Sequence, residues 1–194
     1  MMFRATCVGL AVAGLLACGT LLAGEIEIGA KGPDFKATGV DGAQYSLASA
    51  KGAKVTVLCF TCNLCPVAVA YEDRFIEFNK KYAGKGVKFI AINCNKTENL
   101  EAMKKRSQEK SFNFPYVYDG SADAARAYGA RVTPHLFVLD ENGKVAYRGS
   151  FDDKQKKPTK SFLVDAVEAL LAGKKPPVDS TKAFGCTIKA DLNN

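Results

Sequence analysis

The stretch "FTCNLCP", Phe60 to Pro66, decides the fold of this 194-residue chain. It follows the apolar run "VTVLCF", whose β-branched residues predict a strand that is buried on both faces. It precedes "VAVAYEDRFIEFNKKY", where apolar residues recur every three or four positions and predict one buried helix face. Cys62 and Cys65 therefore stand three residues apart where a strand gives way to a helix.

The rest of the sequence predicts further strands that alternate with helices. A second buried strand is expected in "GVKFIAINC" and a short one in "FPYVYD", and helices in "NLEAMKKRSQEKS" and "SADAARAYG". Hairpins are expected to turn at Asp41-Gly42 and Asn142-Gly143. In the last helix, "SFLVDAVEALLAG", the residues expected to face inward are Phe162, Val164, Val167, Leu170 and Leu171. This order predicts an α/β domain in which helices flank a mixed sheet and the first two buried strands are parallel.

The first two dozen residues differ from the remainder of the chain. Arg4 is the only charged residue before Glu25, and a long apolar run ends at the small pair Ala23-Gly24. This pattern predicts a secretory signal in residues 1–24, and the alternatives are an uncleaved membrane anchor or lipidation at Cys18. We expect an exported, periplasmic or otherwise extracytoplasmic protein with one domain in residues 25–175 and a tail in residues 176–194.

The charge of the chain limits the classes of partner. The formal net charge is +7, but the lysines are scattered and are not interleaved with aromatic residues. This pattern indicates a solvated basic surface and predicts no nucleic-acid groove. A membrane contact is expected only through the signal or an anchor.

Outside the expected signal, which contains Cys7 and Cys18, the chain has five cysteines: Cys59, Cys62, Cys65, Cys94 and Cys186. In an exported protein disulfides persist, and an odd number of cysteines leaves at least one thiol without a partner in the chain. Free N–H groups and the helix dipole stabilise a thiolate at a helix N-terminus. We expect Cys62 to be this activated thiol and Cys65, one turn further along, to be the sheltered thiol that captures it.

Three other interpretations of the cysteines are open. A zinc site would need Cys94, Cys186 and His135 to converge on the pair. An iron–sulfur site would begin with Cys59, which falls in the middle of a predicted strand. The pair could also be inert core packing. Thiol redox chemistry is favoured; it needs no bound cofactor, only a protein or small-molecule thiol or disulfide substrate and an unidentified redox partner.

A second motif, Thr133-Pro134, precedes the last predicted hairpin. With it the chain resembles the thioredoxin superfamily, and "GPDF", "FTCNLCPV", "RAYGARVTPHLFVLD" and "FGCTIK" resemble its redoxin, peroxiredoxin-like (AhpC/TSA-type) branch. The resemblance implies a thioredoxin-like fold with an N-terminal hairpin extension. It also implies that Pro134 is cis beside the cysteines and that Thr133 presents its main chain to substrate. Leu64 stands where this subgroup often has a histidine.

Two redox activities share these residues. One is disulfide exchange; the other is reduction of peroxide, in which peroxiredoxins place a hydroxyl three residues before the attacking cysteine. Here Cys62 occupies that hydroxyl position before Cys65, and Arg126, Arg131 and Arg148 are peroxidase arginine candidates without a motif. Disulfide exchange is therefore favoured.

The remaining thiols extend the candidate site. Cys186 could be an additional resolving thiol on a flexible tail, or it could pair with Cys94, which follows a strand at the same predicted sheet edge. A different class of function is also open, because thiolates and imidazole suit Cu(I). Copper-delivery proteins of the Sco kind resemble this chain, and the corresponding ligands would be Cys62, Cys65 and His135. The Sco motif is one residue longer than the motif found here.

Overall fold

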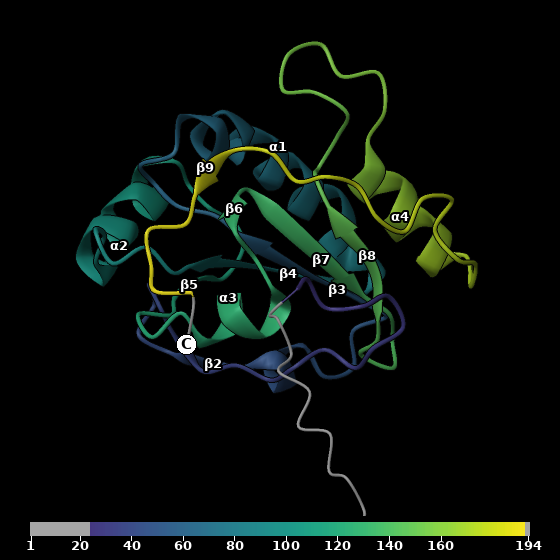
Figure 1. Ribbon diagram of the computed structural model, residues 1–194, viewed down its shortest axis with the longest axis horizontal. Coiled ribbons are helices and arrows are strands. Elements are labelled where there is room, and N and C mark those ends of the chain that lie inside the picture. The colour runs from purple at the N-terminus through teal and green to yellow at the C-terminus, as the bar shows by residue number, and fades with distance from the viewer. Residues whose placement is uncertain (1–23, 193–194) are drawn as a thin grey trace, which may run out of the picture.

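The structure is a computed structural model that describes residues 24–192, and it has a seven-stranded mixed sheet at its centre (Figure 1). In spatial order the strands are β2 (Gln44–Tyr45), β1 (Ala37–Gly39), β5 (Tyr116–Tyr118), β4 (Val87–Asn93), β3 (Val55–Phe60), β7 (His135–Leu139) and β8 (Val145–Gly149). The helices are α1 (Pro66–Tyr82), α2 (Leu100–Glu109), α3 (Asp123–Tyr128) and α4 (Phe162–Leu171), with 3-10 turns η1 (Leu47–Ala50) and η2 (Ala83–Lys85). The expected α/β class is confirmed. The expected signal lies outside the described residues, except for Gly24.

Strand β3 lies inside the sheet, between β4 and β7, and every one of its residues is buried. It pairs in parallel with β4 and antiparallel with β7, as expected for an apolar run covered on both faces. Its alternate residues enter two separate cores: Val57 and Cys59 face one, and Leu58 and Phe60 face the other. The stretch that follows β3 therefore starts from a rigid, buried position.

The helices divide between the two faces of the sheet (Figure 1). The core on one face receives Tyr71 and Phe75 of α1 and Val167 of α4. The core on the other face receives residues of α3, of which Tyr128 packs against Phe60 of β3 with tilted rings at a centroid distance of 6.0 Å. This layering places the beginning of α1 directly beyond the carboxyl end of β3.

Two sequence predictions about the ends of the domain have different outcomes. The N-terminal hairpin is confirmed, since β1 pairs antiparallel with β2 and Gly42 lies in the turn at a φ of +83°. The inward face predicted for α4 was partly wrong. Its fully buried residues are Leu163, Ala166 and Val167, whereas the other four predicted residues are only partly buried.

The chain beyond α4 adds a second, very small sheet. Strand β9 (Cys186–Thr187) pairs antiparallel with β6 (Val132–Thr133), which immediately precedes β7. Figure 1 shows this final segment, drawn in yellow, passing from α4 across the top of the sheet to the side of α2. The peptide bond between Thr133 and Pro134 is cis, as the resemblance implied.

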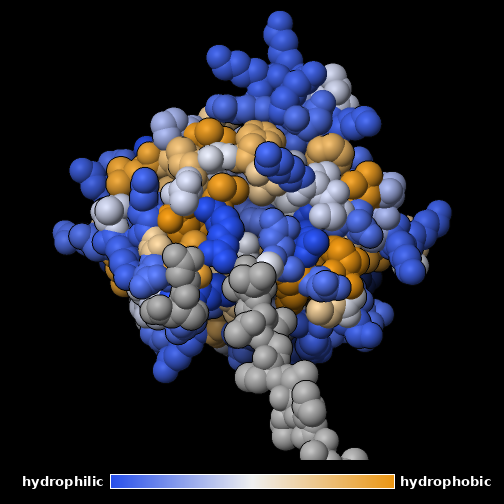
Figure 2. All heavy atoms as spheres, in the orientation of Figure 1, coloured by the Kyte–Doolittle hydropathy of each residue, from blue (hydrophilic) through white to orange (hydrophobic). Residues whose placement is uncertain are grey.

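The surface is largely polar, as the scattered lysines predict. Figure 2 shows hydrophilic side chains over most of one face, with smaller apolar areas between them. The loop between β8 and α4 projects from the domain and carries Lys154, Lys156, Lys157 and Lys160. Within residues 24–192, each helix is too short or too polar to cross a lipid bilayer.

Candidate functional site

The helix that follows the cysteine motif begins later than the sequence analysis assumed. Helix α1 starts at Pro66, and Cys65 is its N-cap, with its sulfur accepting the Ala68 N–H at 3.4 Å. Cys62 lies in the preceding loop rather than at the mouth of the helix. The positions expected for the two thiols are therefore wrong: Cys65 receives the free N–H groups and the positive end of the helix dipole. A proline at the first helical position is the sequence signal for this start.

Thr133 brings the two thiols together from the other side of the site. The Cys65 thiol donates to the Thr133 carbonyl oxygen at 3.1 Å, and the Cys62 sulfur lies 3.4 Å from the Thr133 hydroxyl oxygen. Both cysteines are buried and pack in one small cluster with Ala68. The strand end, the helix start and the residue before the cis-proline thus converge on a pair of sulfur atoms.

The two thiols differ in how readily they ionise. Burial acts to raise the pKa of Cys65, but hydrogen bonds from the Cys186 thiol and the Ala68 N–H outweigh it, so this pKa lies below its ordinary value. For Cys62, burial dominates and raises the pKa to about 11; the Thr133 hydroxyl opposes this rise and the charge of Glu98 adds to it. Near neutral pH, Cys65 is therefore the better source of a thiolate.

A buried polar network, not expected from the sequence, fixes the loop between the cysteines. Glu98 accepts the backbone N–H of Asn63 at 2.9 Å and a side-chain N–H of Asn93 at 3.0 Å. The Tyr116 hydroxyl donates to the Asn63 side-chain oxygen at 2.9 Å. Sequence offered only a weak signal: Glu98 lies in a polar loop just after β4, at the expected sheet edge, but its burial could not be read from the sequence.

Cys186 joins the cysteine pair, whereas Cys94 does not. Cys186 packs against the cluster of Cys62, Cys65 and Ala68, and its pKa is raised by its hydrogen bond with Cys65. Cys94 lies in the other core, with its sulfur 3.8 Å from an Asp119 carboxylate oxygen. Cys59 is completely buried in β3, as predicted. None of these five cysteines forms a disulfide in the described structure.

His135 occupies the interior of the sheet. It is fully buried, packs against the Phe137 ring in a tilted arrangement at a centroid distance of 4.5 Å, and faces a Glu25 carboxylate oxygen at 3.8 Å. Burial and the charge of Arg148 lower its pKa to about 4. Among residues 24–192, no three His, Cys, Asp or Glu side chains are grouped so that they could hold a metal ion. The described structure therefore does not assemble the Cu(I) set of Cys62, Cys65 and His135.

The three candidate arginines for a peroxidase have other partners. Arg126 donates to the Asp191 carbonyl oxygen at 2.7 Å, and Arg131 donates to the Leu192 carbonyl oxygen at 3.1 Å. Arg148 donates to the Glu25 carbonyl oxygen at 2.9 Å. These contacts hold the terminal segments of the chain, so they give no support to a peroxide site at Cys65.

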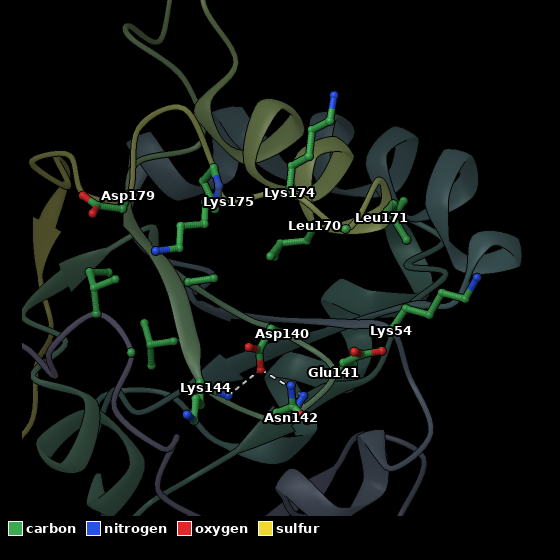
Figure 3. A pocket seen from close by; sticks show the side chains of 16 residues that line it. Lys54, Asp140, Glu141, Asn142, Lys144, Leu170, Leu171, Lys174, Lys175 and Asp179 are labelled. Atoms are coloured by element: carbon green, nitrogen blue, oxygen red, sulfur yellow. Dashed lines mark hydrogen bonds between the residues drawn. The ribbon is translucent and has the colours of Figure 1, made fainter.

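A pocket of about 720 Å³ lies away from the sulfur atoms, between the β7–β8 hairpin and the end of α4 (Figure 3). Its lining includes charged side chains of both signs, among them Lys174 and Lys175 on one side and Asp140 on the other. Asp140 accepts the backbone N–H groups of Asn142 at 2.9 Å and Lys144 at 2.8 Å, and so it stabilises the hairpin turn. No cysteine is in this lining, so the candidate redox site is the thiol cluster.

Comparisons with known proteins identify relatives that carry out thiol redox chemistry. The thiol-disulfide oxidoreductase ResA of Bacillus thuringiensis subsp. konkukian (strain 97-27) is 29% identical over 123 residues, which are 62% of this chain and 68% of ResA. The crystal structure of a hypothetical protein from Sinorhizobium meliloti 1021 is similar with a TM-score of 0.80 and 32% identity, covering 86% of this chain and 96% of that one.

A third similar structure is named for its fold and its chemistry. It is a thiol:disulfide interchange protein of the thioredoxin family from Chlorobium tepidum TLS, with 25% identity and a TM-score of 0.55 over 64% of this chain and 86% of that one. The family model described as Redoxin matches residues 27–166, which include both cysteines of the motif and the cis-proline. The chain therefore belongs to the Redoxin family, within the thioredoxin superfamily.

Proposed function

We propose that this redoxin is a thiol–disulfide oxidoreductase in which Cys65 attacks the substrate and Cys62 completes the exchange. The observation that carries the proposal is the difference between two thiols that both contact Thr133. The pKa of Cys65 lies below its ordinary value, whereas that of Cys62 is about 11. The similarity to ResA supports this class of activity. The assignment exchanges the roles that the sequence alone suggested for the two cysteines.

The reaction needs only thiol chemistry. The Cys65 thiolate attacks one sulfur of a substrate disulfide, and the other substrate sulfur leaves as a thiolate and takes up a proton. Cys62 then loses its proton and attacks the Cys65 sulfur. This second attack forms the Cys62–Cys65 disulfide and releases the remaining substrate thiol. The substrate gains two electrons from the cysteine pair. A reducing thiol partner then supplies two electrons that reduce the Cys62–Cys65 disulfide. With an oxidising partner the same steps run in reverse.

The surroundings of the pair favour a protein substrate. Leu64, between the two cysteines, has 64% of its surface exposed and is one of few large apolar side chains at the described surface. An exposed apolar side chain beside a reactive sulfur can contact an apolar part of a partner. Thr133 is the proposed substrate-binding residue, since its carbonyl oxygen lies beside the Cys65 thiol and its hydroxyl beside the Cys62 thiol.

The export of this protein is also part of the proposal. The basic start and apolar run of residues 1–24 support a cleaved signal, followed by the redoxin domain in residues 25–175 and the tail in residues 176–194. An exported location would suit reversible disulfide chemistry. The mass of the protein recovered from an expressing cell would show whether this segment has been removed.

The roles of the two cysteines can be tested by trapping the mixed disulfide. Two variants, Cys62→Ser and Cys65→Ser, are made in a Cys186→Ser background, in which no third thiol competes and the serine hydroxyl can still donate a hydrogen bond to Cys65. Each is treated with oxidised glutathione and mapped by mass spectrometry. We expect glutathione on Cys65 in the first variant and little or no adduct on Cys62 in the second. An adduct on Cys62 alone would reverse the roles, and no adduct in either variant would contradict exchange through this pair.

A further inference from the structure

The C-terminal tail is held across the redox site by contacts on both sides of Cys186. Before it, the Phe184 ring lies 6.3 Å from the ring of Tyr71 in α1. After it, Ile188 is buried in the core beneath α3, and the Lys189 N–H donates to the Asn95 side-chain oxygen at 2.7 Å. The tail is therefore a fixed strap over the carboxyl ends of β3 and β4, and the expectation of a flexible tail was wrong for this segment (Figure 1).

The strap is seated on the backbone of Thr133. Strand β9 places Cys186 directly opposite Thr133 in the antiparallel register, and the Thr133 hydroxyl lies 3.5 Å from the Cys186 carbonyl oxygen. The preceding residue, Gly185, has a φ of +151°, and a Cβ there would lie 1.9 Å from the Thr133 carbonyl oxygen. Only glycine allows the strap to approach this closely. A glycine at position 185 therefore permits close contact between the tail and Thr133.

This register places a third sulfur beside the proposed attacking one. The Cys186 thiol hydrogen-bonds with Cys65, which lowers the pKa of Cys65 and raises that of Cys186. Cys186 is half-buried, while Cys65 beneath it has only 2% of its surface exposed. An extended segment that pairs with a strand edge and presents a cysteine to a reactive thiol has the arrangement required of a substrate peptide.

We propose that residues 184–188 are an internal substrate segment and that Cys186 is a third exchanging thiol, which forms a disulfide with Cys65. The inference rests on the proposed function, since it requires Cys65 to be a redox-active sulfur. It implies that an external protein substrate docks as an extended, cysteine-bearing segment on Thr133 after the strap has moved aside.

The internal exchange is balanced without another reagent once the pair is oxidised. The Cys186 thiol loses its proton and attacks the Cys65 sulfur of the Cys62–Cys65 disulfide. A Cys65–Cys186 bond forms as the Cys62–Cys65 bond breaks, and Cys62 leaves as a thiolate that takes up a proton. One disulfide replaces another, so the number of electrons held by the protein does not change. The high pKa of Cys62 makes it a poor leaving thiolate, so this step is slower than exchange with a substrate that has a more acidic thiol.

The Cys62→Ser variant tests the inference, because it removes the competing partner of Cys65. The full-length variant is treated with oxidised glutathione and mapped without reduction. We expect an adduct on Cys65 that converts to a Cys65–Cys186 disulfide in most molecules, because the neighbouring thiol acts at a high effective concentration. A stable glutathione adduct on Cys65, with Cys186 still free, would overturn the inference and leave the proposed function intact. If Cys65 carried neither glutathione nor a bond to Cys186, both the inference and the proposed function would be overturned.

The close contact of the strap with Thr133 is tested by adding Gly185→Ala to the same variant. We expect Cys65–Cys186 formation to slow at least about tenfold and alkylation of Cys65 to accelerate, because the added methyl group lifts the strap from Thr133. The matched control is Gly173→Ala, where φ is also positive at +69° but a Cβ would meet no atom within 4 Å. This control should not change the rate. A second variant, Phe184→Ala, loosens the strap without touching Thr133 and should slow the exchange in the same direction. Unchanged rates in both strap variants would contradict the claim that the strap's contacts hold Cys186 beside Cys65.

Discussion

Cys65 and Cys94 have nearly the same small exposed surface, but their pKa values are shifted in opposite directions. Cys65 has 2% of its surface exposed and Cys94 has 3%, so exposure does not distinguish them. The Cys65 sulfur lies at the start of a helix and interacts with the Ala68 N–H and the Cys186 thiol, which stabilise its anion. The Cys94 sulfur is desolvated and faces the Asp119 carboxylate, so its pKa is well above the ordinary value. The donors around a buried thiol, and not its burial alone, decide whether it can react.

The largest expected effect on activity comes from replacing Cys65. Cys65→Ser should reduce disulfide-reductase turnover by a factor of about 1,000 or more, because it removes the attacking sulfur. Cys94→Ser is the matched control, since it changes a thiol that is buried to the same degree, and it should alter turnover less than about twofold. The measurement is the rate of insulin disulfide reduction with a chemical reductant. Comparable losses in both variants would show that the comparison is wrong.

The surroundings of a buried side chain also decide the ionisation of His135, whose ring nitrogens have no hydrogen-bond partner. Its pKa is lowered from 6.5 to about 4, so the unfolded chain takes up a proton more readily than the folded protein. The neutral histidine therefore contributes full stability above pH 6.5, and this stability is lost as the pH falls from 6.5 to 4. The expected loss is about 3 kcal/mol in the free energy of unfolding.

Urea unfolding at a series of pH values can measure this loss against a variant that does not titrate. The wild-type protein should lose more stability between pH 7 and pH 4 than His135→Phe, even though other groups titrate in both proteins. Because Glu25 faces the ring at 3.8 Å and Arg148 lowers its pKa, both residues are kept in the comparison. Parallel stability curves for the two proteins would show that His135 is not the group responsible.

The smallest expected effect concerns the exposed part of the thiol site. Leu64→Ser should lower kcat/KM about fivefold for a protein disulfide, because it removes an exposed apolar contact beside the cysteines. It should leave the rate with oxidised glutathione nearly unchanged, since this small disulfide needs no such contact. A variant far from the cysteines, Val178→Ser, changes a residue that is 41% exposed and serves as the control. Equal losses for both substrates would point to a disturbed site rather than a lost docking contact.

Most of the fold followed from local patterns in the sequence. The apolar run before the cysteine motif became β3, and the periodic residues after Pro66 became the buried face of α1. The Asp41-Gly42 and Asn142-Gly143 pairs both marked hairpin turns. These signals are strong because each depends on a few neighbouring residues. The face of α4 was harder to predict, since that helix has apolar residues around most of its circumference.

The site was only partly predictable, because its chemistry depends on long-range contacts. The cysteine motif and Thr133-Pro134 were found from sequence, but the exchange of roles between Cys62 and Cys65 followed from where α1 begins. The place of Cys186 depends on a two-residue strand, which is too short to leave a periodic signal. Glu98 resembled any loop carboxylate until its burial and its contact with Asn63 were known.

The pH dependence of alkylation measures which of the two site thiols, Cys65 or Cys62, ionises first. Folded, reduced protein is treated with iodoacetamide at a series of pH values, and the modified cysteines are quantified by peptide mass spectrometry. We expect Cys65 to react first, with a midpoint below pH 9, and Cys62 to follow with a midpoint near pH 11. A lower midpoint for Cys62 than for Cys65 would contradict the assignment of Cys65 as the attacking thiol.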